Sequence, residues 1–441
     1  MIKKIYHVIQ RDGLFGFIKS AFVSVASRSI ALPMAVVIIL ISPFVRIRFI
    51  KLFSSRIGHY SFNTEAILCS LDMNLEGDQR RKIIFYTLPG DPICNSQLHL
   101  MWKRTIPIFP LSYVAAEADK LLIRYGGKKY REYPAKVTFE PSGDGRDKWN
   151  LLEKIKKCHL SFTPQEEARG LSLLKEMGVP LGAPFICLLV RDSAYLTTYM
   201  PSIDWSYHDN RDADINSYQL AAQHLADRGY YVIRMGKVVK QPFLTDHPKV
   251  IDYANSQFRS DFMDIYLSAK CFFYLTTCSG LDSVACVFRK PLLVTNLVLQ
   301  DFDIWHHWEL FIPKKIMNLK TNKTLTFKEM KKLYVELKHK RKIPQLMREE
   351  GLRYIDNTPQ EISDAVDEML GLLSGKWKYS EGDNRLQGHF WEDFPRYLIS
   401  DHVSPFNLPI CDDVKMRVGT DFLKNNLSLL TDMEMSQVHS L

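Results

Sequence analysis

The segment from Cys271 to Val294 carries the residues whose types and spacing best fit a phosphate site. It predicts a buried strand, a small-residue turn that includes Ser279 and Gly280, and a short helix that begins near Asp282 and Ser283. A turn between a strand and a helix N-terminus offers unpaired backbone N–H groups to an anion. In this interpretation Ser283 donates to phosphate, and Asp282 either accepts from a ribose or sugar hydroxyl or caps the helix. The alternative is a plain βαβ crossover in which the glycine serves packing.

Four basic side chains at the ends of neighbouring elements suit the same anionic ligand. Arg191 follows the apolar strand PFICLLV, Arg234 and Lys237 end the strand VIRMGK, and Arg259 precedes a helix. Because a guanidinium can bind two phosphate oxygens at once, Arg191 is expected to hold a diphosphate. Of Arg234 and Lys237, one is expected to assist and the other to be structural. The alternative for Arg191 is an ion pair with its neighbour Asp192.

Transfer of a group to a hydroxyl needs a general base, and the first part of the chain offers three candidates. His59 in RIGHYSFN and Asp91 in LPGDPICN are the predicted catalytic residues, with Glu65 as a further possibility. The alternative for His59 is a hydrogen-bonded residue of the core.

The loop from Asp192 to Asp214 is long, polar and aromatic, which is typical of a functional loop. His208, Asp209, Arg211 and Asp212 crowd one short turn of it and indicate a binding edge. A metal ion is not expected there, because no DxD motif follows an apolar strand. No cofactor is predicted beyond the substrate itself.

These residues sit in a chain that alternates between expected strands and helices. Capping boxes at Thr163–Glu166, Thr326–Glu329 and Thr358–Glu361 open three helices. Between the first and last boxes, short apolar strands alternate with helices of 10 to 15 residues, which indicates βαβ units and a parallel sheet. Residues 107–113 are expected to form a further strand, and few regular elements are expected between residues 375 and 414.

The N-terminal segment has a composition of its own. Residues 1–56 hold nine basic side chains and one acid, and residues 29–45 are uncharged. Phe15 and Phe22 lie in an amphipathic stretch just before the apolar run. This pattern favours helices that lie in the cytoplasmic leaflet and are held by anionic lipid. The alternatives are a single membrane span and a buried core helix.

Composition bounds the remaining choices. The 441 residues are 46% hydrophobic, which suits two or three domains with sizeable cores. None of the eight cysteines forms a CxxC pair, which argues for reduced thiols and against a disulfide framework or a zinc site. The net positive charge is concentrated in the N-terminal segment, and the rest of the chain is nearly neutral, so no nucleic-acid partner is expected.

Several segments resemble a bacterial family of glycosyltransferases associated with surface-polysaccharide biosynthesis. They are RIGHYSFNTE, PICNSQLHLMWKR, VRDSAYL, HDNRDADINSY, RGYYVIRMGK, IDYANSQFRSDFMDIYLSAKC and SGLDSVA, which span most of residues 56–298. The arginine in LLVRD is also similar to the phosphate-binding arginine of fucosyltransferase-type enzymes, although Leu189 stands where those enzymes have histidine. The resemblance implies a GT-B-type α/β fold with two Rossmann-like domains.

Four regions are therefore expected: a membrane-associating segment at 1–54, an acceptor domain at 55–162, a donor nucleotide-sugar domain at 163–374, and a tail at 375–441 that packs back on the domains. The predicted function is transfer of a sugar from a nucleotide sugar to a glycan or lipid-linked acceptor, at the cytoplasmic face of the inner membrane. The alternatives are a nucleotide-sugar epimerase or hydrolase of similar fold, and a non-catalytic glycan- or nucleotide-binding scaffold.

Overall fold

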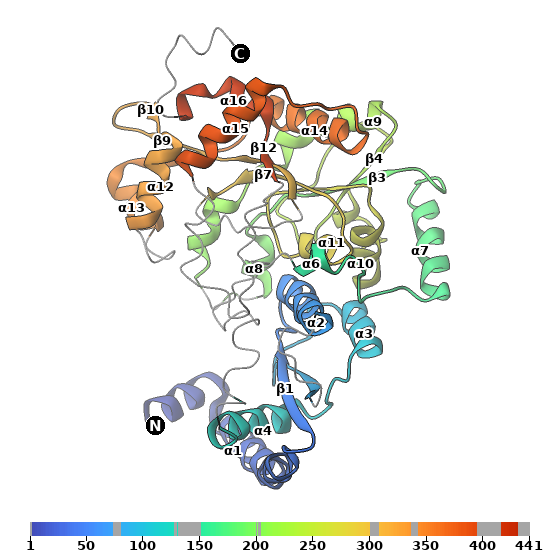
Figure 1. Cartoon of the computed structure of the whole chain (residues 1–441), viewed down its shortest axis with the longest axis vertical. Coiled ribbons are helices and arrows are strands. Elements are labelled where there is room, and N and C mark those ends of the chain that lie inside the picture. Colours follow the sequence, from blue (N-terminus) through green and yellow to red (C-terminus); the bar gives the residue numbers. More distant parts are fainter. Residues whose placement is uncertain are drawn as a thin grey trace. The chain divides into compact units, whose positions relative to one another are not determined.

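The computed structural model describes residues 2–73, 81–127, 130, 151–199, 201, 204–299, 308–336, 343–394 and 416–430 (Figure 1). Contacts divide the chain into two compact units. Unit 1 comprises Met1–Gly145 and His159–Ser161, and unit 2 comprises Arg146–Cys158 and Phe162–Leu441. The N-terminal segment therefore belongs to unit 1, and the C-terminal tail belongs to unit 2.

Unit 1 is an α/β unit with a small parallel sheet. Its elements are α1 (Ile2–Ile41), β1 (Arg46–Leu52), η1 (His59–Asn63), α2 (Thr64–Asp72), β2 (Arg81–Thr87), α3 (Ser96–Thr105) and α4 (Ser112–Tyr125). Strands β1 and β2 pair in parallel, and Phe85 of β2 also forms a bridge with Ile108. The described part of unit 1 thus holds a two-stranded parallel sheet and one bridge.

Helix α1 packs along α4 through small side chains. Ala31, Ala35 and Ile38 of α1 are buried in one cluster with Ala115 and Ala118 of α4. Alanines allow the two helix backbones to approach closely. Because this face of α1 is covered by α4 while most other side chains described for α1 are exposed or half-buried, the described part of α1 is not a core helix that is buried all round.

Unit 2 is built around a seven-stranded parallel sheet. The strands are β3 (Phe185–Leu189), β4 (Tyr231–Arg234), β5 (Val250–Ile251), β6 (Tyr274–Thr276), β7 (Leu292–Leu297), β8 (Trp308–Pro313) and β12 (Arg417–Val418). Their order is β12-β8-β7-β6-β3-β4-β5, and every neighbouring pair is parallel. Every residue of β3 and β7 is buried, which is the pattern of strands covered on both faces.

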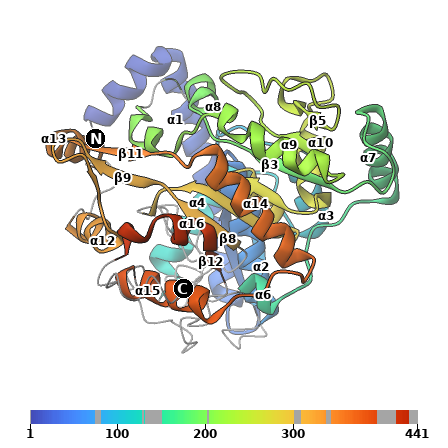
Figure 2. The same cartoon turned by 90° about the horizontal axis from the view of Figure 1, so that it is seen from above.

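Helices cover both faces of this sheet (Figure 1). Helices α9 (Gln219–Asp227) and α14 (Pro359–Leu373) pack together on one face, where α14 crosses β7 and β8 (Figure 2). Helices α10 (Asp261–Lys270) and α11 (Asp282–Val287) contact each other on the opposite face. This layering matches the α/β class and the parallel sheet that the alternation of elements predicts.

The remaining elements of unit 2 surround the large sheet. They are α6 (Leu151–Lys154), α7 (Pro164–Glu176), α8 (Ala194–Tyr199), η2 (Ser206–Arg211), η3 (Ile215–Tyr218), η4 (Tyr253–Asn255), β9 (Lys315–Asn318), β10 (Lys323–Thr324), α12 (Phe327–Glu336), α13 (Ile343–Glu350), β11 (Leu352–Ile355), α15 (Glu381–Asp393), α16 (Thr420–Asn425) and η8 (Leu427–Leu429). Strands β10, β9 and β11 form a separate antiparallel sheet.

The capping signals are confirmed, whereas two other local predictions are wrong. Thr163, Thr326 and Thr358 each exchange hydrogen bonds with the glutamate three residues on, at the start of α7, α12 and α14. Residues 107–113 form no strand beyond the bridge at Ile108, because two prolines cannot donate ladder bonds and α4 begins at Ser112. Helix α15 was not expected, and it forms where buried Phe390 packs on Phe311 and Phe327.

Candidate functional site

The order of the large sheet reverses between β3 and β6. From β3 the chain continues to β4 and β5 on one side, whereas from β6 it continues to β7 and β8 on the other. In open α/β sheets, ligands bind outside the carboxyl ends of the strands at such a reversal. Strand β3 ends at Leu189 and β6 ends at Thr276, so Arg191 and the turn Cys278–Gly280 follow directly on either side of this point.

Hydrogen bonds join the two chain segments beyond the strand ends. The amide of Arg191 donates to Oγ1 of Thr277 over 2.8 Å, and the amide of Thr277 donates to the carbonyl of Leu189 over 3.1 Å. These bonds continue the β3–β6 pairing past the sheet. Arg191 and the turn after β6 are therefore held on the same edge of the sheet, as predicted from the sequence.

The guanidinium of Arg191 is turned to a protein partner. Arg191 is only 9% exposed, and its Nη1 atom bonds to the carboxylate of Asp212 and to the carbonyl of His208, the latter over 3.0 Å. Burial, together with nearby Arg211, lowers the pKa of Arg191. An ion pair was the alternative expected for Arg191, but its partner is Asp212. In this structure Arg191 supports the loop that carries residues 208–212.

Asp192, the ion-pair partner expected from the sequence, instead joins two loops. Its carboxylate accepts from the amides of Ala194 and Lys240, each over 2.9 Å. This bonding fixes the start of α8 beside the loop that follows β4. Asp192 thus links the two loops at this edge of the sheet and does not pair with Arg191.

Arg211 is the cation that lies against the turn after β6. Its Nη2 atom donates to the carbonyl oxygen of Cys278 over 2.6 Å, and its side chain is half-buried. In the sequence, Arg211 is one of four titratable groups that crowd a short turn of this loop. This crowding of titratable groups was the sequence signal for a binding site. Only the fold shows which of the four side chains reaches the turn after β6.

The buried carboxylate of Asp282 stabilises the turn after β6 through two hydrogen bonds. Its Oδ2 atom accepts from Oγ1 of Thr276 over 2.8 Å and from the amide of Ser279 over 2.7 Å. Asp282 and Ser283 are both buried, and burial raises the pKa of Asp282 to about 6. These contacts fit the capping role proposed for Asp282. The Ser279 amide donates its hydrogen bond to Asp282. Gly280 is the residue of the turn that is exposed.

Lys237 and Arg259 form a second basic group beyond the end of β4. Arg259 bonds to Asp264 over 2.7 Å and to Asp261 over 3.2 Å. The Nζ atom of Lys237 lies 3.7 Å from Asp261 and 5.3 Å from the centre of the Tyr199 ring. Asp261 thus connects the two cations, and both side chains are partly exposed.

Arg234 belongs to the interior of unit 2. It is 1% exposed, and it donates to Asp252 over 3.0 Å and to the carbonyl of Gln241 over 3.2 Å. Of the pair Arg234 and Lys237, the structure gives Arg234 the structural role and leaves Lys237 nearer the solvent.

The two predicted catalytic residues lie in unit 1, in different environments. His59 is half-buried, its Nδ1 atom lies 3.3 Å from Nδ2 of Asn63, and its ring centre lies 5.8 Å from that of Phe53. Burial, with a smaller effect of Arg56, lowers the pKa of His59, so its imidazole is neutral at pH 7. Asp91 is exposed in a turn after Gly90.

A small cavity of about 20 Å³ adjoins the His59 ring. Lys51, Phe53, Asn63 and Ile67 contribute to its lining. A space of this size holds roughly one water molecule. It therefore has no room for a sugar.

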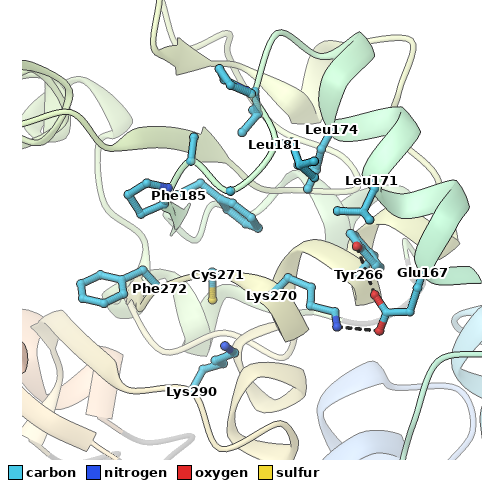
Figure 3. Close-up of a pocket in the computed structure, with 15 residues that line it drawn as sticks. Glu167, Leu171, Leu174, Leu181, Phe185, Tyr266, Lys270, Cys271, Phe272 and Lys290 are labelled. Atoms are coloured by element: carbon cyan, nitrogen blue, oxygen red, sulfur yellow. Dashed lines mark hydrogen bonds and ion pairs between the residues drawn. The ribbon is translucent and has the colours of Figure 1, made fainter. Parts of the chain in front are cut away.

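A larger hollow of about 420 Å³ lies at the amino ends of the strands in unit 2 (Figure 3). Leu171, Phe185 and Phe272 contribute to its mainly apolar wall, and Lys270 at its rim bonds to Glu167 over 2.6 Å. This hollow faces the edge opposite the Arg191 side of the sheet. Its lining carries none of the predicted site residues.

No protein-family model and no curated protein sequence matches the chain. Solved structures that match include a family 9 glycosyl transferase from Veillonella parvula, at 10% identity over 57% of this chain and 80% of that chain, with a TM-score of 0.33. The E. coli ADP-heptose lps heptosyltransferase II matches at 13% identity over 75% and 99%, with a TM-score of 0.36. A UDP-N-acetylglucosamine 2-epimerase matches at 14% identity over 76% and 98%, with a TM-score of 0.30. Similarities of this size establish no family and no activity.

Proposed function

We propose that the protein is a membrane-associated glycosyltransferase that uses a nucleotide sugar and builds a surface glycan. The observation that carries this proposal is the pairing of Arg211 with the turn Cys278–Gly280 at the reversal point of a parallel sheet. An exposed turn with an adjacent guanidinium suits a diphosphate. The sequence resemblance to polysaccharide glycosyltransferases supplies the reaction class.

The diphosphate is the leaving group of such a reaction. The acceptor oxygen forms a bond to the anomeric carbon while the bond from that carbon to the diphosphate breaks, and negative charge collects on the diphosphate. Fixed cations that face this charge lower the barrier. We assign this role to Arg211, with Lys237 and Arg259 as further phosphate contacts, and Arg191 positions the loop that carries Arg211.

The acceptor hydroxyl must lose its proton in the same step. We propose His59 as the base, acting through the one water that the adjoining cavity can hold, because its lowered pKa keeps the imidazole neutral and able to accept a proton at pH 7. Asp91 is the alternative base, since its side chain is exposed. The buried carboxyl of Glu65 has no exposed surface, which removes it from this role.

The membrane part of the proposal is carried by the side of α1 that faces away from α4. Its exposed apolar side chains recur every three or four residues and include Phe15, Ile18, Phe22, Val25, Leu32, Val36 and Leu40. Ser29 occupies the one polar position of this stripe. Such a stripe on a basic segment suits the interface of an anionic leaflet.

The stretch Ile18–Ile41 is also long and apolar enough to cross a membrane. A span would surround α1 with lipid, whereas Ala31, Ala35 and Ile38 are buried against α4. This packing supports a helix that lies in the plane of the cytoplasmic leaflet. A glycosyltransferase with a lipid-linked acceptor gains from such docking, whereas an enzyme that acts on soluble sugar nucleotides does not.

The test is a thermal-shift screen of the full chain in detergent micelles against UDP, GDP, ADP, CMP and dTDP. A ligand that binds the folded state at 100 times its Kd adds about 2.7 kcal/mol of stability, so one nucleotide class should raise the Tm clearly. The matching nucleotide sugar is then incubated with and without a bacterial membrane lipid extract. Release of the nucleotide that depends on the extract supports the transferase. Conversion of the sugar without extract identifies an epimerase or hydrolase, and the absence of any nucleotide response rejects both.

A further inference from the structure

A cluster of side chains of the types that bind metals lies in unit 1, apart from His59 and Asp91. Glu65 and Cys69 stand one turn apart on α2, and His159 reaches them from the short segment His159–Ser161. Glu65 and Cys69 are completely buried, and the His159 side chain is 18% exposed. A carboxylate, a thiol and an imidazole therefore meet in a site that is largely shielded from solvent.

The spacing of the three groups is close to that of ligands around one ion. Nδ1 of His159 lies 3.1 Å from Oε1 of Glu65, and Sγ of Cys69 lies 3.9 Å from the same oxygen. All three ligand atoms lie within 4.8 Å of one another. Zinc–ligand bonds of about 2.0–2.3 Å place the ligands of a tetrahedral site about 3.3–3.7 Å apart. Small side-chain movements would thus bring the three atoms to a shared ion.

The second ring nitrogen of His159 supports the same conclusion. Nε2 lies 3.0 Å from Oδ2 of Asp72, the last residue of α2. Histidines that ligate metals commonly donate their other ring N–H to a carboxylate, which fixes the tautomer and the ring orientation. With its proton on Nε2, His159 directs the Nδ1 lone pair toward Glu65 and Cys69.

The chemistry of the ligands selects the metal. A thiolate and an imidazole suit zinc, whereas magnesium and calcium prefer oxygen ligands alone. We propose that Glu65, Cys69 and His159 form a zinc site whose fourth ligand is water, with Asp72 as the residue that positions His159. The ion would fasten residues 159–161 to α2 at the place where the chain leaves unit 2 for three residues and then returns to it.

This site was not visible in the sequence. The search for zinc motifs relies on closely spaced cysteine pairs, and this chain has none. Here the first two ligands are four residues apart on a helix, and the third follows ninety residues after Cys69. Only folding brings His159 to α2.

The test measures metal binding by the full chain in detergent, purified without chelators and without a metal-affinity step. We expect one zinc per chain by elemental analysis. After exchange with Co²⁺, we expect a thiolate-to-cobalt absorption band. Cys69→Ser and His159→Gln should lose the band, whereas Cys94→Ser, which alters a unit 1 cysteine outside the cluster, should keep it.

Asp72→Asn provides a readout that does not depend on loss of a ligand. This variant keeps all three ligands. It should weaken Co²⁺ affinity about 10- to 100-fold, as is typical when a carboxylate that bonds to a metal ligand is lost. Wild-type protein that binds no stoichiometric zinc and gives no thiolate band would overturn the proposal. In that case the cluster is an imidazolium held between the Glu65 and Asp72 carboxylates. A band that persists in Cys69→Ser would equally reject the assignment.

Discussion

The Nη2 atom of Arg211 lies 2.6 Å from the carbonyl oxygen of Cys278, so a cation from the loop after β3 rests on the turn after β6. Cys278 has a φ of 63°, which is uncommon for a residue other than glycine. Asp282 holds the next amide, that of Ser279, from the other side. Uncommon backbone conformations that are held by surrounding contacts concentrate at functional sites. This arrangement yields the first two predictions below.

Arg211→Ala should weaken the affinity for the nucleoside diphosphate that the screen identifies. A hydrogen bond to a charged group contributes about 1.5–3 kcal/mol, which corresponds to a loss of about 10- to 100-fold. Isothermal titration calorimetry measures the effect. Arg228→Ala is the matched control, because Arg228 is an exposed arginine of unit 2 that pairs with Asp367 at the amino side of β4. Equal affinities of the Arg211 variant and wild type would remove Arg211 from the donor site.

Asp282→Asn should change how the stability of unit 2 depends on pH. The pKa of Asp282 is about 6 in the folded state and near 3.8 in the unfolded chain, so the folded state binds more protons between these values. The free energy of unfolding of the wild type therefore decreases as pH rises from about 4 to about 6, by on the order of 3 kcal/mol from this group. The uncharged variant lacks this contribution.

Urea unfolding at pH 4.5 and pH 7 checks this effect as a difference between variant and wild type. Because Asp119 and Asp212 also have pKa values raised to about 6 by burial, only the difference isolates Asp282. Asp246→Asn, at an exposed position in unit 2, controls for the loss of one surface carboxylate. If Asp282→Asn and wild type keep the same pH dependence, the turn does not hold a perturbed carboxyl.

Phe22→Glu should reduce binding of the full chain to vesicles that contain anionic lipid. Phe22 is 72% exposed in the α1 stripe, and burial of a large apolar side chain contributes about 2 kcal/mol, or about 30-fold in partitioning. Vesicle flotation quantifies the bound fraction. Ser20→Glu adds the same charge at an exposed position on the other side of α1 and should bind nearly as wild type. Undiminished binding of the Phe22 variant would argue against docking through the stripe.

Gly170→Ala should destabilise the packing of α7 on α10. A Cβ atom at Gly170 would lie 2.2 Å from the Tyr266 ring, and overpacking of this kind costs about 1–3 kcal/mol. Gly388→Ala in α15 is the contrasting change, since nothing lies within 4 Å of its added Cβ. There the alanine should stabilise the helix by about 0.5–1 kcal/mol. Chemical denaturation followed by circular dichroism distinguishes the two, and equal effects would contradict the close contact with Tyr266.

The sequence predicts a helix or strand correctly where one short motif is enough to form it. The capping box at Thr358 predicts the start of α14, because the two hydrogen bonds that form it involve residues only three apart. Helix α15 escaped prediction, because its sequence is polar and contains two glycines. Its stability comes from the contacts of Phe390 with Phe311 and Phe327, which are distant in the chain. Packing thus overrode local preference there.

The sequence by itself determined the α/β class, the parallel sheet of unit 2, the strand ends that carry Arg191 and Ser279, and the basic apolar character of the N-terminal segment. These properties follow from composition and from patterns of apolar and polar residues that repeat every few positions. Such patterns depend only on residues within one helix or strand. The tertiary structure alone decided that Arg191 pairs with Asp212, that Arg211 reaches Cys278, and that His159 meets Glu65. Each of these contacts depends on which strands become neighbours and how loops cross between them. Such choices are made by the packing of the whole unit.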